Sequence, residues 1–142
     1  MIRPATSSDE TAWLEIRNEQ EARFWSGVKK EITPAEHAAW FRWALSNPAH
    51  VLRVAEAPGG KVVGYARFEL GLVGTVSFGV AAPARGQGIG TDLLRVLDEA
   101  AEGTDVTLSA WVHPSNIPSI RAFMRTGYQR GGEPGYELLV KQ

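Results

Sequence analysis

Residues 80–91 have the composition of a backbone anion site. They read Val-Ala-Ala-Pro-Ala-Arg-Gly-Gln-Gly-Ile-Gly-Thr, an apolar stretch that runs into a glycine-rich turn. Glycines leave backbone N–H groups uncovered, and the positive end of a following helix dipole adds to their attraction for an anion. We therefore predict a phosphate or pyrophosphate site here, with a flexible connector as the alternative. The predicted contacts are Arg85, Gly86, Gln87, Gly88, Ile89, Gly90 and Thr91.

The spacing of these glycines separates the segment from two other phosphate loops. The nucleotide triphosphatase loop needs Gly-Lys-Ser/Thr after four residues, and this sequence has no such step. The dinucleotide fingerprint needs Gly-x-Gly-x-x-Gly, but Leu93 stands where its third glycine belongs. The first loop is excluded, and the second fits poorly.

Two motifs resemble those of one enzyme superfamily. Arg85, Gly88 and Gly90 match Arg/Gln-x-x-Gly-x-Gly/Ala, the coenzyme A pyrophosphate signature of the GCN5-related N-acetyltransferases (GNAT). Further on, residues 116–128 look like the family's Asn-x-x-Ser/Ala helix that ends in Gly-Phe/Tyr. The chain therefore resembles the GNAT superfamily, clearly over residues 52–140 and more loosely before them.

The resemblance implies both a fold and a coenzyme. It implies an α/β single domain over residues 1–142, with a mixed central sheet, two splayed parallel strands (75–81 and 106–112) and helices on both faces. Acetyl-CoA would be the co-substrate, and the amine would attack it directly in a ternary complex. The acetyl carbonyl would lie near Gly79 and Val80, where a backbone N–H can bind the oxyanion. Asn116 and Ser119 would contact the coenzyme; Asn116 also fits an ordinary helix N-cap.

Proton transfer is where the chain departs from the family pattern. Many members carry an acidic Tyr seven residues after the helix Asn, but this chain has Phe123, which we expect in the core or against pantetheine. His37 is a candidate base, because its ordinary pKa of about 6.5 suits it to accept a proton from the ammonium; a solvated helix histidine is the alternative. Ser77 interrupts an apolar strand and is either a proton relay or a surface-facing residue.

The N-terminal third carries the substrate clues. Its Trp-Leu-Glu-Ile-Arg-Asn element at 13–18 and later aromatics look like the pseudaminic-acid-pathway N-acetyltransferases, which acetylate nucleotide-linked amino sugars. We accordingly expect Arg17, Arg23 and Trp25 to bind such a substrate, with Trp25 in a loop. Ribosomal-protein, peptide N-terminal and polyamine acetylation remain alternatives, as does a non-catalytic acyl-CoA-binding regulatory domain.

The elements that must position these residues can be read from the sequence. A helix is expected from Ser7 to Asn18, an aromatic-containing loop after it, and a second helix from Thr33, whose hydroxyl, Pro34 and Glu36 form a strong start. The other expected helices cover 89–103 and 115–126, and the expected strands cover 2–5, 51–57, 61–70, 72–81, 106–112 and 136–140.

Composition narrows the remaining function classes. A net charge of −1 offers no basic field for nucleic acid, and no apolar run approaches the roughly 20 residues of a membrane span. Cysteine is absent and the three histidines lack close ligand spacing, so we expect no metal. The sequence predicts a cytoplasmic monomer or homodimer that acts on a small-molecule amine.

Overall fold

The computed structural model describes residues 1–26, 30–69, 74–104, 106–131 and 137–141. Its strands are β1 (Ile2–Pro4), β2 (His50–Glu56), β3 (Val62–Glu69), β4 (Gly74–Val80), β5 (Leu108–Val112), β6 (Gln129–Arg130) and β7 (Glu137–Lys141). Its helices are α1 (Glu10–Arg17), α2 (Gln20–Ser26), α3 (Pro34–Ser46), α4 (Ile89–Ala101) and α5 (Ile117–Arg125), with 3₁₀ turns η1 (Ser7–Asp9) and η2 (Ala82–Ala84).

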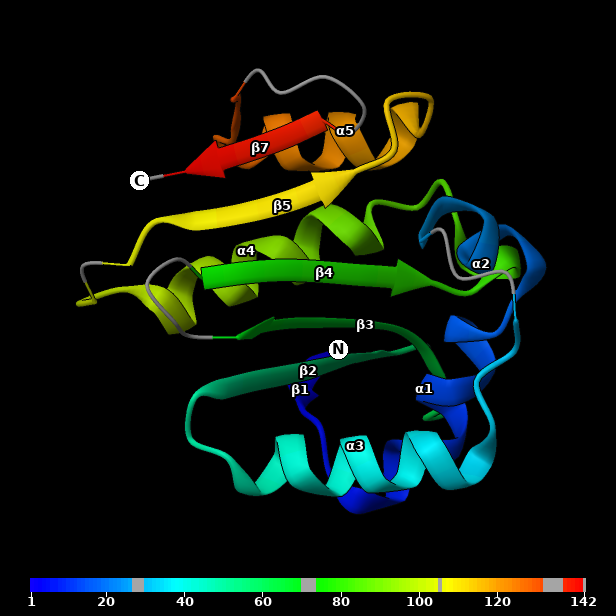
Figure 1. Cartoon of the computed structure of the whole chain (residues 1–142). Helices are drawn as coiled ribbons and strands as arrows, with labels where there is room; N and C mark the ends of the chain where they lie inside the picture. Colours follow the sequence, from blue (N-terminus) through cyan, green and yellow to red (C-terminus); the bar gives the residue numbers. More distant parts are fainter. Residues whose placement is uncertain (27–29, 70–73, 105, 132–136, 142) are drawn as a thin grey trace.

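The strands form one sheet in the order β1-β2-β3-β4-β5-β7-β6 (Figure 1). Among the described strands, neighbours are antiparallel except β4 and β5, which are parallel. This arrangement confirms the mixed sheet expected from the sequence.

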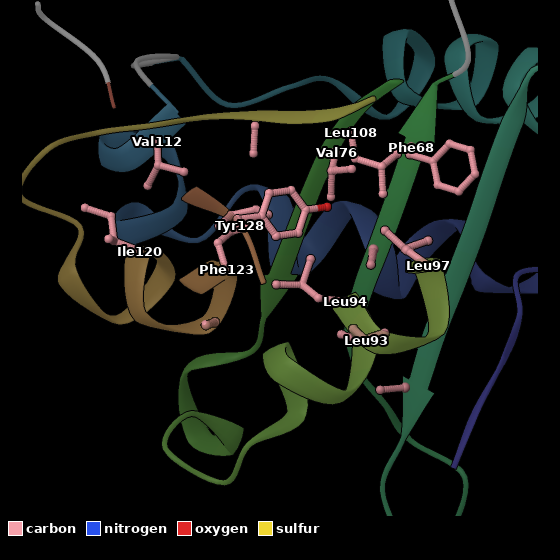
Figure 2. Packing of buried hydrophobic residues seen from close by; sticks show 14 residues of the cluster. Phe68, Val76, Leu93, Leu94, Leu97, Leu108, Val112, Ile120, Phe123 and Tyr128 are labelled. Atoms are coloured by element: carbon pink, nitrogen blue, oxygen red, sulfur yellow. The ribbon is translucent and has the colours of Figure 1, made fainter. Parts of the chain in front are cut away.

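Helices cover both faces of the sheet, and each face has its own apolar cluster. Figure 2 shows the larger cluster, in which Leu93, Leu94 and Leu97 of α4 and Phe123 of α5 pack on sheet residues such as Val76. On the other face, Trp13 of α1 and Phe41 of α3 cover Leu52 and Val54 of β2. The predicted two-faced packing is therefore confirmed.

Local sequence explains where α3 begins. The Thr33 hydroxyl accepts a hydrogen bond from the Glu36 N–H at 3.2 Å, and Pro34 occupies the first position. Both features satisfy or remove N–H groups that a helix leaves without partners at its start. The predicted start of this helix is confirmed.

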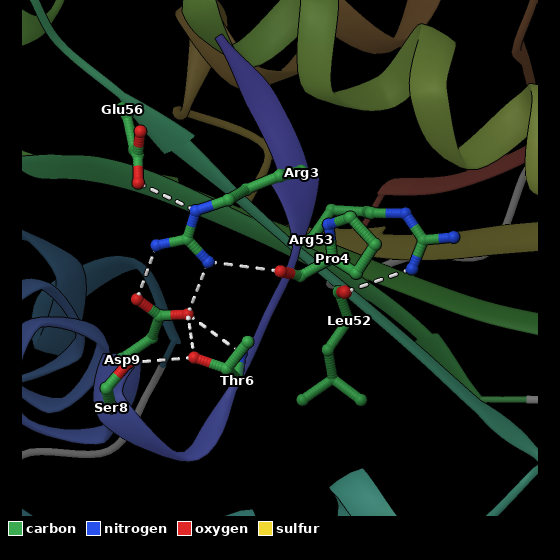
Figure 3. A network of polar contacts seen from close by, with 8 residues as sticks. All are labelled: Arg3, Pro4, Thr6, Ser8, Asp9, Leu52, Arg53 and Glu56. Atoms are coloured by element: carbon green, nitrogen blue, oxygen red, sulfur yellow. Dashed lines mark hydrogen bonds and ion pairs between the residues drawn. The ribbon is translucent and has the colours of Figure 1, made fainter. Parts of the chain in front are cut away.

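Arg3 ties the first strand to the first turn and to β2 (Figure 3). Its guanidinium donates to both carboxylate oxygens of Asp9 at 2.8 Å and to Glu56 at 2.7 Å. The Asp9 side chain is 4% exposed, and the hydrogen bond from Arg3 lowers the pKa of its carboxyl group. This network fixes the N-terminal segment that leads into α1.

One expected element differs from the structure, and the ends of some expected strands fall outside the described residues. The aromatic-containing loop predicted after Asn18 is wrong for residues 20–26, which form α2, so Trp25 lies on a helix. The short strand β6 was not expected. Leu70, Leu72 and Tyr136, expected at strand ends, lie outside the described residues.

Candidate active site

Strands β4 and β5 pair only where they begin. Gly74 is opposite Leu108 and Thr75 is opposite Ser109, and the Gly74 N–H donates to the Thr107 carbonyl at 2.9 Å. Beyond Thr75, β4 runs on to Val80 without a β5 partner in the described sheet, and the two arrows separate toward their tips in Figure 1. The expected splay of the parallel strands is confirmed.

The backbone of Val80 points into this separation. Its carbonyl accepts a hydrogen bond from Arg85 Nε at 3.1 Å, whereas the next residue, Ala81, donates its N–H to Val63 of β3 at 2.8 Å. In a strand the N–H and C=O of one residue point to the same edge, and successive residues alternate. The N–H of Val80 therefore faces away from β3, and that of Gly79 faces toward it.

The glycine-rich loop follows directly and opens α4. Gly86 and Gly88 adopt φ values of 80° and 82°, and no described atom lies within 4 Å of where a side chain would start at either residue. Gly88 is the N-cap of α4, whose first N–H groups lack helical acceptors. The loop thus has the open backbone and the helix terminus that an anion site needs.

Gly90 is a glycine for a different reason. A Cβ atom there would lie 2.7 Å from Cε2 of Phe78, so the residue allows α4 to approach the aromatic ring on β4. Its φ is not in the left-handed region, unlike those of Gly86 and Gly88. The three glycines therefore play two roles, which their spacing alone does not separate.

Arg85 connects the loop to the N-terminal helices. Its guanidinium pairs with Glu19 at 3.2 Å and with Glu21, and the Glu19 carboxylate also accepts the Ala82 N–H at 3.1 Å. These contacts neutralise Arg85 within the protein and hold α2 beside the glycine loop. A contact between Arg85 and phosphate stays a prediction.

The second motif lies on α5. The Asn116 side chain caps this helix, accepting the Ser119 N–H at 3.4 Å, and Ser119 is half-buried. Phe123 is 2% exposed and packs edge-on against Phe78 and Tyr128, with ring centroids 5.4 and 4.9 Å apart. Phe123 thus belongs to the core cluster, one of its two expected places.

His37 is enclosed rather than solvated. Its side chain is 1% exposed, its ring lies among those of Trp40 and Phe41, and Nε2 has no hydrogen-bond partner among the described residues. Burial, followed by the charge of Arg17, lowers the pKa of this histidine. The alternative of a solvated helix histidine is wrong, and the catalytic role stays a prediction.

The predicted substrate residues lie in separate groups. The Arg17 guanidinium is over the Trp40 ring, 5.7 Å from its centroid, whereas Arg23 donates to the Asn18 carbonyl at 3.1 Å. Trp25 packs beside His113 at the end of β5, with centroids 5.3 Å apart.

Ser77 is half-buried and lies opposite Arg67 of β3. The sequence did not identify Arg67 as a candidate site residue. An arginine that alternates with apolar residues on a strand is typical of a solvated sheet face. No signal in the sequence distinguishes Arg67 from such a residue.

A cavity of about 760 Å³ lies between α1, the β2–β3 hairpin and the glycine loop. Its charged side chains are Glu15, Glu19, Glu56 and Asp92 against Lys61. Glu56 is paired with Arg3 and Glu19 with Arg85, so part of this negative charge is compensated by neighbouring arginines.

The described residues hold neither a metal-ligand cluster nor a membrane-spanning helix. No group of three or more His, Asp or Glu side chains there is arranged to hold a metal ion. No helix in the same ranges combines the length and hydropathy of a bilayer span.

Comparison with known families decides the identity. The sequence model of the acetyltransferase (GNAT) domain matches residues 1–129. The chain belongs to the GNAT acetyltransferase family. It is an acetyl-CoA-dependent N-acetyltransferase, as the two motifs predicted, and acetyl-CoA is its co-substrate. No curated protein matches the sequence.

Solved structures agree with this GNAT assignment. A ribosomal-protein-alanine N-acetyltransferase from Brucella melitensis is 28% identical, with a TM-score of 0.85 over 99% of this chain and 96% of that one. An N-acetyltransferase from Staphylococcus aureus Mu50 is 29% identical, with a TM-score of 0.83 over 99% and 93%. A phosphinothricin acetyltransferase from Sinorhizobium meliloti, in complex with acetyl-CoA, shares the fold at 21% identity and a TM-score of 0.88 over 99% and 86%.

Proposed function

We propose that this GNAT enzyme transfers the acetyl group directly to a primary amine of a small molecule, at the open end of the β4–β5 separation. The observation that carries the proposal is the N–H of Val80, which points into that separation just before the glycine loop. A donor at this place can meet the thioester oxygen while the loop binds the distant phosphates.

Coenzyme A has an extended place in this arrangement. The pyrophosphate binds the backbone N–H groups of residues 86–91, and the pantetheine arm follows the unpaired edge of β4 toward Val80. Asn116, the N-cap of α5, and Ser119 on that helix have the polar side chains expected beside that arm. The open left-handed backbone at Gly86 and Gly88 supports this placement.

The chemical step needs a neutral amine and an acceptor for negative charge. The amine nitrogen forms a bond to the thioester carbon while the carbonyl electron pair moves to oxygen, where the Val80 N–H stabilises it. Such a donor contributes about 3 kcal/mol in acyl transfer. Collapse breaks the carbon–sulfur bond, releases the coenzyme A thiolate, and leaves an N-acetyl product once the ammonium proton has departed.

Proton transfer relies on few side chains. Phe123 has no proton to donate, so the thiolate leaves unaided or is protonated by water. His37 remains the proposed base and Ser77 the proposed relay. For His37, proton acceptance requires a path into its aromatic enclosure, because the imidazole is 1% exposed.

A nucleotide-linked amino sugar is our proposed acceptor within the class of small-molecule amines. Arg17, Arg23 and Trp25 supply the charge and the aromatic face that a nucleotide diphosphate needs. Similar solved structures include phosphinothricin, aminoglycoside and ribosomal-protein-alanine acetyltransferases, so the shared fold serves several amine classes.

An amine panel with two product readouts tests the proposal. Release of coenzyme A thiol and formation of the N-acetyl amine are measured for a nucleotide-linked amino sugar, the free sugar, spermidine and an N-terminal peptide. The proposal predicts equal amounts of thiol and acetylated amine, with the nucleotide sugar favoured. Thiol release without acetylated amine would contradict amine transfer, and preference for spermidine or peptide would contradict the acceptor alone.

A further inference from the structure

Two arginines from different elements meet at one indole. The guanidinium carbon of Arg67, on β3, lies over the Trp40 ring at 5.0 Å from its centroid, and that of Arg17, on α1, lies over it at 5.7 Å. Trp40 belongs to α3, so three separate elements build the group. Cation–π contact holds each guanidinium at the ring, but it does not remove the repulsion between them.

The positive charge of this pair is poorly compensated. Among the described residues, Arg67 forms an ion pair with Glu69, whose carboxylate oxygen is 3.7 Å from the guanidinium and whose side chain is 49% exposed. Within the described residues, Arg17 has no ion-pair partner, and Glu19, on the following turn, is engaged by Arg85. Burial, followed by the charge of Arg17, lowers the pKa of Arg67, as expected where positive charge is concentrated.

The pair lies on the face of the sheet that borders the acetyl-transfer end. Arg67 is opposite Ser77 and Tyr65 is opposite Gly79, and a Cβ at Gly79 would meet the Tyr65 ring at 2.7 Å. Tyr65, Arg67, Ser77 and Gly79 therefore present their side-chain positions on one face. Two residues along β4 correspond to about 7 Å, a separation that a small bifunctional molecule can span.

We infer that Arg17, Arg67 and Trp40 form an anion site for the acceptor, which selects small amines that carry a carboxylate or phosphate group. The inference rests on the proposed site of acetyl transfer and names the substrate class that this site takes. Two guanidiniums can donate several charge-assisted hydrogen bonds to one oxyanion, and Trp40 fixes their approach. An acceptor bound this way directs its amine toward Val80.

Paired substrates that differ in one anionic group test the site. 4-Aminobutanoate is compared with butylamine, and phosphoethanolamine with ethanolamine, by kcat/KM in the wild type and in Arg67→Gln and Arg17→Gln. Arg42→Gln is the matched control, because Arg42 is exposed on the same helix as Trp40. The two pairs distinguish a carboxylate from a phosphate as the preferred anion.

The wild type should favour at least one anionic amine over its uncharged counterpart by tenfold or more. Arg67→Gln and Arg17→Gln should raise KM for the anionic amines at least tenfold more than KM for the uncharged amines, and Arg42→Gln should change neither. Equal rates for charged and uncharged amines, or equal losses for both, would overturn the anion site while amine acetylation stands.

Direct measurement of ligand binding tests the anion site even if no amine is acetylated. Phosphoethanolamine and 4-aminobutanoate are titrated into the protein by calorimetry, with the same three variants. If no amine is acetylated but binding weakens tenfold in Arg67→Gln, the proposed reaction fails and the anion site stands. Absence of binding to the wild type, or unchanged binding in both arginine variants, would overturn the site.

Discussion

The N–H of Val80 can be removed without disturbing the strand beside it. Because this N–H faces away from β3, a Val80→Pro substitution deletes no hydrogen bond of the β3–β4 ladder. Val80→Ala is the matched control, since it also loses the valine side chain but keeps the N–H. Replacement of Val80 by its α-hydroxy acid exchanges N–H for oxygen with almost no change of shape.

The expected loss of rate follows from the contribution of one N–H donor to stabilising the oxyanion. A single oxyanion donor contributes about 3 kcal/mol, which corresponds to about 150-fold in rate. We expect kcat to fall by that factor in Val80→Pro and in the α-hydroxy acid variant, and by less than threefold in Val80→Ala. The dissociation constant of acetyl-CoA, measured by calorimetry, should stay within about threefold, because this bond strengthens only in the transition state.

Two results would refute the assignment of Val80. One is a kcat within a few-fold of wild type in the α-hydroxy acid variant while acetyl-CoA still binds. The other is an equal loss in Val80→Ala, which would attribute the effect to packing. Melting temperatures of the three variants separate either result from a failure to fold.

Three further predictions concern the loop, the enclosed histidine and the N-terminal network. The Gly88→Asp and Gly88→Asn variants carry side chains of nearly the same shape, and both residues tolerate φ > 0. The negative charge of Asp, at about 5 Å from two phosphate charges, should weaken acetyl-CoA binding about 15-fold more than Asn does, as measured by calorimetry. Equal affinities of the two variants would show that the pyrophosphate does not bind this loop. The pKa of His37 is lowered in the folded protein, so protonation of this histidine favours the unfolded chain. The free energy of unfolding should therefore fall as the pH drops below about 6.5, and it should fall less steeply in His37→Gln. If the acidic limb of the kcat/KM profile persists in His37→Gln, His37 is not the base. Asp9→Asn should lose about 3 kcal/mol of unfolding free energy at pH 7, and progressively less as the pH falls below about 3.8 and through the lower pKa of the folded carboxyl group; a loss that stays constant over this acid range would contradict the charge-based explanation.

The sequence was sufficient for the features that are local. The hydroxyl of Thr33 with Pro34 predicts the start of α3, and the apolar stretch followed by closely spaced glycines predicts the strand, turn and helix that build the loop. Each of these features depends on contacts between residues a few positions apart, so the local sequence is enough to predict it.

Features that depend on distant contacts were missed. α2 has seven residues and no regular apolar stripe, and its place is set by the bonds of Arg85 to Glu19 and Glu21. The enclosure of His37 and the meeting of Arg17 with Arg67 at Trp40 likewise join separate elements. Periodicity describes one element at a time and therefore cannot reveal them.

Coenzyme A is proposed to lie along the edge of β4, between the glycine loop and Val80. A crystal structure of the protein with a thioether analogue of acetyl-CoA tests that claim in one measurement. We predict the pyrophosphate on the N–H groups of residues 86–91, the pantetheine arm between β4 and β5, and the acetyl oxygen within hydrogen-bond distance of the Val80 N–H. Density for the coenzyme in the cavity between α1 and the β2–β3 hairpin, with the β4 edge vacant, would contradict it.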